Sequence, residues 1–292
     1  MSTLTYHSPA KINLYLAITG RRPDSFHNLV SVVAPLEWGD TLQVHAADEF
    51  SLTCSDPTLP VDASNLVIKA AMAFRAATGS RIGAAFSLEK RIPMGAGLGG
   101  GSSNAAMALR ALNHLAGEPL DFAALSAVAA TVGSDCPLFL HPSSIIMRGR
   151  GELIEPLPRD AVERMRGQHV LVFKPAFSIS TPWAYRELAK EAPAGYVAPE
   201  EAEKRLAEWT TGRRQLGDLL FNNLERPAFR KFPALPILHD RLAKQFGLAP
   251  RMSGSGSACF AFLKPEAPVT AIATAIRDAW GESAFLLQTR LA

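Results

Sequence analysis

Residues 93–104 form a segment whose composition points to chemistry. Its sequence is Pro-Met-Gly-Ala-Gly-Leu-Gly-Gly-Gly-Ser-Ser-Asn, with five glycines within seven positions and two hydroxyls directly after them. The segment lies between an expected strand and an expected helix, where unpaired backbone N–H groups and the helix dipole favour bound anions. A turn alone does not need so many glycines. The sequence therefore predicts an anion-binding loop.

Two common phosphate-binding motifs match this loop only in part. Gly95, Gly97 and Gly100 satisfy the G-x-G-x-x-G pattern of dinucleotide-binding folds. Such folds also need an acidic residue about 20 positions on, at the end of a second strand, whereas the acidic residues at that distance lie between two expected helices. A P-loop needs a lysine where this chain has Gly101. A charge-neutralising lysine and any metal ligands must therefore come from elsewhere in the chain.

Two further segments carry residues with chemical potential. Residues 9–14 are Pro-Ala-Lys-Ile-Asn-Leu, and residues 252–257 are Met-Ser-Gly-Ser-Gly-Ser. Together with the glycine loop they resemble, in order and spacing, the three motifs of the GHMP kinases, the superfamily of galactokinase, homoserine kinase, mevalonate kinase and phosphomevalonate kinase. The resemblance extends over most of the chain. It implies a two-domain α+β fold with the active site in the interdomain cleft, where ATP phosphorylates a small-molecule alcohol.

The resemblance implies that the glycine loop holds the phosphates of ATP, with Mg²⁺ as the accompanying ion. Asn65 falls where the family contacts adenine, although its position before an expected helix would equally explain it as an N-cap. Of the two hydroxyls, one would cap the following helix and the other would serve Mg²⁺, and the residues leave that choice open. The expected nucleotide-binding residues are Asn65, Pro93, Met94, Gly95, Ala96, Gly97, Leu98, Gly99, Gly100, Gly101, Ser102 and Ser103.

Phosphoryl transfer calls for a base near the acceptor hydroxyl and a cation near the transferring group. Asp135, within residues 133–137 (Gly-Ser-Asp-Cys-Pro), is the candidate base. The residues alone fit a self-capping turn equally well, and the resemblance favours catalysis. Lys11 lies in an expected strand and could simply point to solvent. The resemblance instead implies that it neighbours the catalytic aspartate, where it could lower the aspartate pKa and stabilise transferred charge.

Aromatic residues are the candidates for binding the pyrimidine that the resemblance implies in the acceptor. A pyrimidine needs an aromatic face to stack on and hydrogen bonds to its edge, and Phe26, His27 and Tyr185 are the candidates, although a buried Phe and a surface His are individually common. Residues 22–29 and 178–182 resemble a branch of the family whose acceptor carries a cytidine diphosphate. That branch usually has Tyr where this chain has Phe26, so stacking is kept and a hydroxyl is lost. The other implied acceptor-binding residues are Asn13, Thr181, Gly254, Ser255 and Gly256.

Two alternatives remain open from the sequence. A sister GHMP kinase could act on mevalonate derivatives or homoserine, but those substrates carry no nucleobase for Phe26, His27 and Tyr185. A non-catalytic nucleotide-binding regulator could retain the fold, but it would not need both Lys11 and Asp135.

Composition excludes several other classes. The chain has 292 residues, 48% hydrophobic and 20% charged, and a net charge of +3 without a basic block. We therefore expect a globular protein with no nucleic-acid partner. Three scattered cysteines indicate neither a disulfide framework nor a zinc site. The beginning of the sequence lacks a signal or transit pattern, and no apolar run could span a membrane. We expect a cytoplasmic protein of a bacterial cytosol, with no membrane partner, as a monomer or weak homodimer.

The pattern along the chain mixes strands and helices without a regular βαβ period, which favours α+β. Expected strands cover residues 11–19, 40–46, 84–88, 170–173 and 258–263. Expected helices cover residues 65–77, 102–115, 121–131, 183–190, 199–209, 237–246 and 269–279. Pro156, Pro158 and a charged run interrupt the pattern near residues 155–168. This break predicts a domain boundary, and the resemblance implies an ATP-binding and catalytic domain at 1–160 and a substrate-binding domain at 161–292.

Overall fold

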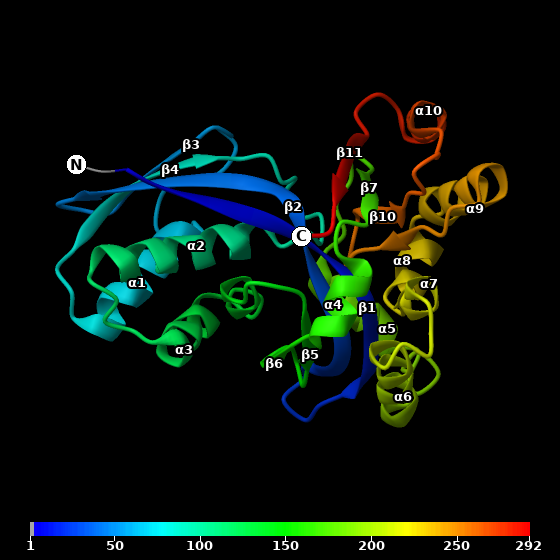
Figure 1. Cartoon of the computed structure of the whole chain (residues 1–292), viewed down its shortest axis with the longest axis horizontal. Coiled ribbons are helices and arrows are strands. Elements are labelled where there is room, and N and C mark those ends of the chain that lie inside the picture. The colour runs from blue at the N-terminus through cyan, green and yellow to red at the C-terminus, as the bar shows by residue number, and fades with distance from the viewer. Residues whose placement is uncertain (1–2) are drawn as a thin grey trace. The chain divides into compact units, whose positions relative to one another are not determined.

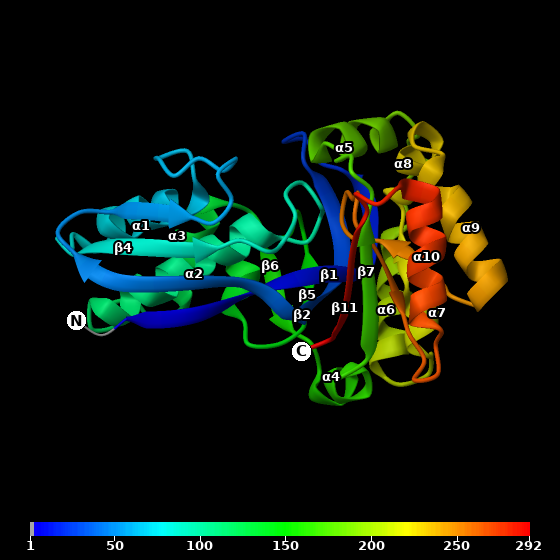
Figure 2. The same cartoon turned by 90° about the horizontal axis from the view of Figure 1, so that it is seen from above.

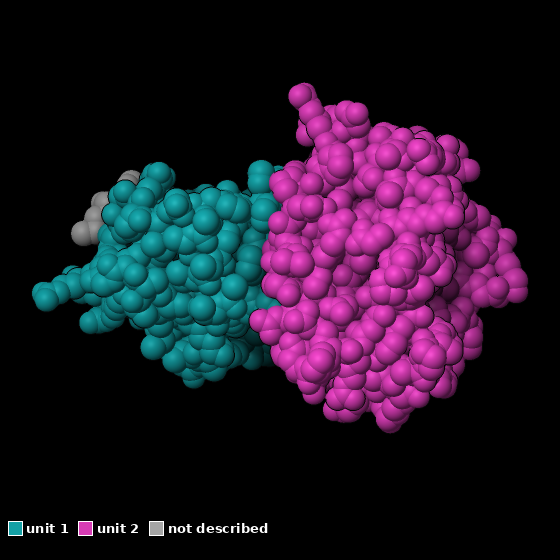
Figure 3. Space-filling model, turned by 90° about the horizontal axis from the view of Figure 1, so that it is seen from below, with its two compact units in different colours: residues 1–10, 38–94, 99–142 teal, residues 11–37, 95–98, 143–292 magenta. Residues whose placement is uncertain are grey.

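The computed structural model describes residues 3–292 and divides them into two compact units. The first unit contains the described part of residues 1–10 together with residues 38–94 and 99–142, and the second contains residues 11–37, 95–98 and 143–292 (Figure 3). Two long strands, β1 (Leu4–Arg21) and β2 (His27–Ala47), contribute residues to both units. The functional division near residue 160 stays a prediction.

The first unit is a sheet covered on one face by helices (Figures 1 and 2). The second half of β2 pairs antiparallel with β4 (Gly83–Glu89), and β3 (Ser51–Cys54) pairs parallel with β4. The helices are α1 (Leu66–Thr78), α2 (Gly100–Leu115), α3 (Phe122–Val132) and the 3₁₀ turn η1 (Pro137–Leu140). Apolar side chains from both layers, among them Leu42, Phe74, Phe86, Leu109 and Leu112, are buried between them.

Local sequence explains where these helices begin. The Asn65 side chain accepts the Val67 N–H and caps α1, and the Asp121 side chain accepts the Ala124 N–H and caps α3. Helix α2 has no side-chain cap at its first turn; it starts after Gly99, whose φ is 74°. Only glycine adopts this left-handed conformation without a steric penalty. The amide groups of the first turn of α2 are therefore not consumed by a capping side chain.

The second unit contains a part of the β1–β2 sheet and a separate four-stranded sheet. In the former, β1 pairs parallel with β8 (Phe221–Asn222), β2 pairs antiparallel with β5 (Ile145–Arg148), and β5 pairs antiparallel with β6 (Leu153–Pro156). The separate sheet is antiparallel with the order β11-β7-β10-β9. Its strands are β7 (His169–Lys174), β9 (Arg251–Met252), β10 (Cys259–Phe262) and β11 (Phe285–Arg290).

The remaining helices complete the second unit (Figure 2). They are α4 (Arg159–Met165), α5 (Thr181–Ala189), α6 (Pro199–Thr210), α7 (Leu216–Leu219), α8 (Glu225–Lys231), α9 (Ala234–Phe246) and α10 (Val269–Trp280). Helices α9 and α10 contact each other beside the four-stranded sheet. Their buried faces include Leu238 and Leu242 of α9 and Ile272 and Ile276 of α10, each pair at the four-residue spacing of one face of an amphipathic helix.

The mixture of helices with largely antiparallel sheets confirms the predicted α+β class, and the predicted helices are present. The strand predicted at 40–46 is only the end of the 21-residue β2. Its earlier half, from Leu29 to Leu36, is buried almost without interruption, so it lacks the alternation that identifies a half-exposed strand. The sequence analysis also missed β3, β5, β6, β8, β9, β11, α4, α7 and α8, most of which are short. None of the helices in residues 3–292 has the length and apolar character that a membrane crossing requires.

Candidate active site

Lys11 does not point to solvent. It lies on β1 with 5% of its surface exposed, and its Nζ donates hydrogen bonds to Asn13 Oδ1 at 2.6 Å and to the Gly97 carbonyl at 2.8 Å. Asn13, two residues along the strand and on the same face, donates from Nδ2 to Ser31 Oγ at 3.0 Å. These bonds hold the Lys11 amine beside the Asn13 amide, so the positive charge of Lys11 has a fixed position in the second unit.

The loop at residues 252–257 reaches the same place. Ser253 Oγ donates to the Gly97 carbonyl at 3.0 Å and accepts from the Asn13 N–H at 3.3 Å. Gly97 has a φ of 75°, and a Cβ atom there would lie 2.2 Å from the Ser253 carbonyl oxygen. A Cβ atom at Gly254 would lie 3.5 Å from Lys11 Nζ. Parts of all three motifs therefore meet within the second unit, and the close approach requires glycine at position 97.

Two further predicted residues lie against this loop. Thr181 Oγ1 and Ser255 Oγ are 2.6 Å apart, and Thr181 opens helix α5. Gly256 has a φ of 84°, and a Cβ atom there would lie 2.5 Å from the sulfur of Met252. The Ala96 carbonyl accepts the Ala258 N–H at 3.1 Å. Residues 95–97 and 252–258 are thus joined through both backbone and side-chain contacts.

The end of the glycine loop belongs to the first unit. Gly100 and Gly101 begin helix α2, and a Cβ atom at Gly100 would lie 2.9 Å from atoms of Ile92 and Lys90. Ser103 is fully buried and its hydroxyl accepts from Ser8 Oγ at 2.8 Å, whereas Ser102 is only half-buried. At the start of the loop Met94 is 54% exposed and Pro93 is half-buried. The two hydroxyls therefore have different surroundings.

Asp40, which the sequence analysis missed, forms hydrogen bonds on both sides of the glycine loop. Its carboxylate is fully buried and accepts the N–H groups of Arg91 at 2.7 Å and Ile92 at 2.8 Å, just before the loop. It also accepts from Asn104 Nδ2 at 2.9 Å, just after the loop, and forms an ion pair with buried Lys90. A single aspartate in a strand gives no sequence signal for this role.

Asp135 occupies the turn between α3 and η1, where it is half-buried. The next residue, Cys136, is buried, and burial raises the pKa of its thiol to about 11, opposed by a hydrogen bond with Ser102. Ser102 and the segment of Asp135 are therefore neighbours within the first unit. Lys11 belongs to the second unit, and its pairing with Asp135 stays a prediction.

Asn65 is occupied by local structure. Its Oδ1 accepts the Val67 N–H at 2.9 Å and its Nδ2 donates to the Pro60 carbonyl at 2.7 Å. Both ends of the amide serve the start of α1, so capping alone is a sufficient reason for asparagine here. Its contact with adenine stays a prediction.

The predicted aromatic residues gather in the second unit. The His27 and Tyr185 rings lie 5.2 Å apart between centroids, and Tyr196, which the sequence analysis missed, lies 5.9 Å from His27. Burial and the nearby Arg21 charge lower the His27 pKa, which favours the neutral ring. Within the described chain, buried His27 Nε2 and Tyr196 Oη have no hydrogen-bond partner. Phe26 is 53% exposed, with the Arg150 guanidinium 4.9 Å from its ring centroid.

Comparison with known proteins identifies the class to which this fold and these motifs belong. Residues 65–142 match the family model of the GHMP kinases N terminal domain, and residues 205–282 match that of the GHMP kinases C terminal domain. A crystal structure of a homoserine kinase from Cytophaga hutchinsonii shares the fold, with a TM-score of 0.70 over 96% of this chain and 95% of that chain at 18% identity. The fold is that of a small-molecule kinase of the GHMP class.

Relatives with higher identity narrow the class. The 4-diphosphocytidyl-2-C-methyl-D-erythritol kinase of Chlorobium chlorochromatii is 40% identical over 259 residues, 88% of each chain. That of Gloeobacter violaceus is 34% identical and covers 100% of this chain and 96% of its own. A crystal structure of 4-(cytidine 5'-diphospho)-2C-methyl-D-erythritol kinase matches with a TM-score of 0.77 and 36% identity over 99% of this chain and all of that chain. The chain belongs to the family of 4-diphosphocytidyl-2-C-methyl-D-erythritol kinases, and as a GHMP kinase it uses ATP.

Proposed function

We propose that this protein transfers the γ-phosphoryl group of ATP to the 2-hydroxyl of 4-diphosphocytidyl-2-C-methyl-D-erythritol, a step of the non-mevalonate route to isoprenoid precursors. The hydroxyl oxygen forms a bond to the γ-phosphorus, the bond to the β-phosphate oxygen breaks, and the products are the 2-phosphate and ADP. The relatives that carry this name support the substrate. We propose the bacterial cytosol as its location.

The observation that carries the proposal is the placement of Lys11. The buried ammonium of Lys11 donates to Asn13 and to the Gly97 carbonyl and lies close to Gly254. It is therefore a fixed cation where the three motifs meet. Phosphoryl transfer is mainly positioning and charge stabilisation, so a preorganised cation is worth most when water is excluded from it. We propose that Lys11 stabilises the transferring group and that Asp135 accepts the proton of the hydroxyl.

The nucleotide side would be formed by the glycine loop and by Ser102. Mg²⁺ prefers oxygen ligands and keeps few protein contacts when phosphates and water complete its coordination. The half-buried Ser102 hydroxyl at the first turn of α2 fits that requirement better than Ser103, whose hydroxyl is buried against Ser8. When bound, Mg²⁺ would supply positive charge that offsets the charge of the phosphates. We propose Ser102 as its protein ligand.

The acceptor side would be formed by the aromatic group around His27. A cytosine ring offers a face for stacking and an edge with donors and acceptors, which suits Phe26, Tyr185 and a neutral imidazole. The buried His27 Nε2 and Tyr196 Oη, without partners in residues 3–292, are polar groups whose desolvation a nucleobase edge would compensate. We propose that Thr181 and residues 254–256 contact the acceptor beyond the base.

A coupled ADP-release assay tests this function. We expect ATP-dependent turnover of the diphosphocytidyl alcohol and background rates with mevalonate and homoserine. Asp135→Asn should lower kcat by about 10²- to 10⁴-fold with unchanged folding, because general-base catalysis contributes on that scale. Asp121→Asn is the matched control, since asparagine still caps a helix and turnover should remain.

Two results would contradict the proposal. Turnover of mevalonate or homoserine in preference to the diphosphocytidyl alcohol would reject the substrate. Equal turnover in Asp135→Asn and the wild type would reject the base while leaving the substrate in place.

A further inference from the structure

Asn222, just after β8 begins, holds two carbonyl groups of the loop at residues 252–257. Its side chain is 4% exposed, and Nδ2 donates to the Met252 carbonyl at 2.7 Å and to the Gly254 carbonyl at 2.8 Å. Its Oδ1 accepts the Leu224 N–H at 2.9 Å, which fixes the orientation of the amide. Asn222 therefore joins two points of a loop 30 residues away in the sequence to the segment before α8.

Glu225, three residues later, holds the same loop from its N-terminal end. Its side chain is half-buried, and Oε1 accepts the Met252 N–H at 2.7 Å. Burial raises the pKa of Glu225 to about 7, opposed by this hydrogen bond and by the charge of Arg251. Three backbone groups of the loop, Met252 N, Met252 O and Gly254 O, are thus set by one short segment.

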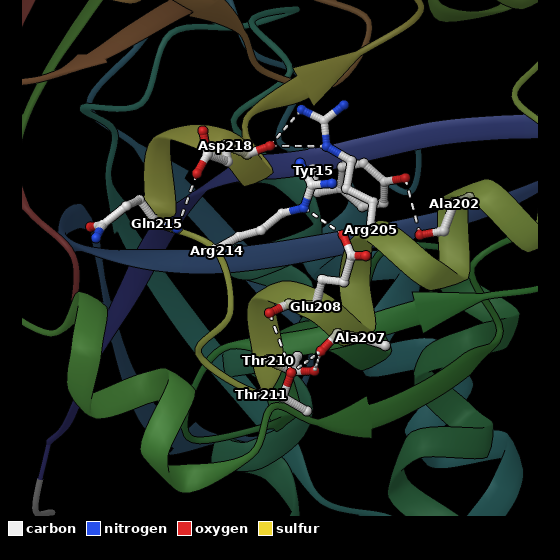
Figure 4. Close-up of polar contacts among 10 residues, drawn as sticks. All are labelled: Tyr15, Ala202, Arg205, Ala207, Glu208, Thr210, Thr211, Arg214, Gln215 and Asp218. Atoms are coloured by element: carbon white, nitrogen blue, oxygen red, sulfur yellow. Dashed lines mark hydrogen bonds and ion pairs between the residues drawn. The ribbon is translucent and has the colours of Figure 1, made fainter.

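The segment that carries these two residues is itself supported (Figure 4). Arg205 of α6 donates to the Asp218 carbonyl from Nε at 3.0 Å and Nη2 at 2.6 Å, and its guanidinium lies 5.1 Å from the ring centroid of Phe221. Phe221 pairs with Tyr15 on β1, and Tyr15 Oη donates to the Ala202 carbonyl at 3.2 Å. Asn222 and Glu225, which we call the clamp of this loop, therefore belong to a segment that contacts strand β1 and helix α6 rather than another loop.

We propose that Asn222 and Glu225 are positioning residues that hold Gly254 beside Lys11 and Asn13. Gly254 has a φ of 59° and no side chain of its own to fix its conformation. Without the amide of Asn222, its carbonyl would be free to rotate toward the position where an acceptor phosphate is expected, and a carbonyl oxygen repels an anion. The kinetic consequence rests on the proposed function; the positioning itself does not.

The neighbouring residue supplies a matched control. Asn223 is as buried as Asn222, at 3% exposure, and also makes three hydrogen bonds. Its partners are Ile18 and Gly195, outside the loop at residues 252–257. Asn222→Ala and Asn223→Ala should therefore lower the midpoint of urea unfolding similarly.

Kinetics separate the two asparagines. Asn222→Ala should lower kcat/KM for the diphosphocytidyl alcohol about 100-fold, the scale of a misplacement of about 1 Å, with the KM for ATP within threefold of the wild type. Asn223→Ala should change kcat/KM less than fivefold. Equal losses of kcat/KM in both variants would overturn the proposal, because they would indicate destabilisation alone.

Glu225 gives a second test if Asn222→Ala does not fold. Glu225→Gln keeps an oxygen that can accept the Met252 N–H, so its kcat/KM should stay within threefold of the wild type at pH 8. Glu225→Ala loses the acceptor, and its kcat/KM should fall at least tenfold. The proposal fails if both variants behave alike.

Amide hydrogen exchange of residues 252–257 tests the clamp without any substrate. Ser253 and Gly256 donate to the Ala258 and Ser253 carbonyls in the folded loop, so these amides should exchange slowly in the wild type and at least tenfold faster in Asn222→Ala, but not in Asn223→Ala. Faster exchange in Asn222→Ala with no wild-type turnover would reject the proposed function and retain the clamp. Identical exchange in all three proteins would reject the clamp whatever the turnover.

Discussion

The two glycine-rich segments, residues 93–104 and residues 252–257, have similar compositions but are held by opposite kinds of side chain. The first is flanked by groups that converge on the Asp40 carboxylate, which accepts the N–H groups of Arg91 and Ile92 and the amide of Asn104. The second is held largely by Asn222, which donates to the carbonyls of Met252 and Gly254. One clamp accepts hydrogen bonds and the other mainly donates them.

This difference is informative because an anion needs donors and is repelled by carbonyl oxygens. Asp40 takes the backbone N–H groups of Arg91 and Ile92, which precede the glycines, and the side-chain amide of Asn104, which follows them, so it occupies no backbone N–H group of the glycines. Asn222 takes the carbonyls of Met252 and Gly254. In neither case does Asp40 or Asn222 take a backbone N–H group of a glycine. Asp40 carries a charge and Asn222 does not, so substitutions that disrupt the two clamps should have effects of different size.

The largest effect is expected at the charged clamp. Asp40→Asn leaves buried Lys90 without its counter-charge and should lower the free energy of unfolding by about 3–5 kcal/mol, the usual cost of breaking a buried ion pair. Urea denaturation measures it. Asp56→Asn is the control, because Asp56 is only half-buried and asparagine can still accept from Thr58, so its effect should stay below about 1 kcal/mol.

A double variant sharpens this prediction. Asp40→Asn/Lys90→Met removes both charges and should recover a large part of the lost stability, because the cost arises from the unpaired cation. If the double variant is less stable than the sum of the single changes predicts, the ion pair is not the source of the effect.

A smaller, pH-dependent effect on the free energy of unfolding is expected at Glu225, in the clamp of the second glycine-rich segment. The pKa of Glu225 is raised from 4.5 to about 7, so the folded protein retains a proton that the unfolded chain loses. The contribution of this group to the free energy of unfolding should therefore fall by roughly 3 kcal/mol as pH rises from about 4.5 to about 7. Burial raises the pKa of Cys259 well above 9, so this thiol does not titrate in that window. Burial lowers the His239 pKa from 6.5 to about 3, so the contribution of His239 to the free energy of unfolding rises with pH up to about 6.5 and opposes that of Glu225.

Glu225→Gln isolates this contribution. Urea unfolding of the variant and the wild type from pH 4.5 to pH 8 should give a difference in free energy that grows in favour of the variant by roughly 3 kcal/mol. A difference that is constant across the range would show that Glu225 ionises in the folded state as it does in the unfolded chain.

The smallest effects are expected at the paired hydroxyls of the first loop. Ser103→Ala removes the bond with Ser8 and should cost about 1 kcal/mol of unfolding free energy, with little change in the KM for MgATP. Ser102→Ala should leave stability within about 0.5 kcal/mol and raise that KM several-fold. Thermal unfolding and initial-rate kinetics measure both, and the reverse pattern would assign the metal to Ser103.

Much of the fold could be predicted because its signals are local. The caps at Asn65 and Asp121 and the apolar spacing of α9 and α10 are contained in short windows of sequence. The buried half of β2 and the short strands β3, β5 and β6 could not be predicted in this way. Their residues depend on partners from distant segments rather than on neighbours in the chain.

The candidate site likewise contains residues that could be predicted from the sequence and residues that could not. Lys11, Asn13 and the glycines at 97, 254 and 256 could be predicted from motifs. At the glycine positions, a left-handed φ or a close backbone approach leaves glycine as the residue that fits. Asp40, Asn222, Glu225 and Tyr196 could not, since each acts through a contact with a residue far away in the sequence. Their residue types alone are those of ordinary strands, turns and helix starts.

The sequence by itself determined the composition of the glycine loop at residues 93–104, the anion chemistry that it favours and the family that its motifs resemble. The tertiary structure decided which of its hydroxyls is buried, that Gly97 contacts Ser253, and that Lys11 lies buried against Asn13 rather than in solvent. The physical reason is that backbone conformation and donor chemistry are local properties. Burial and hydrogen-bond partnership depend on which distant segments pack together.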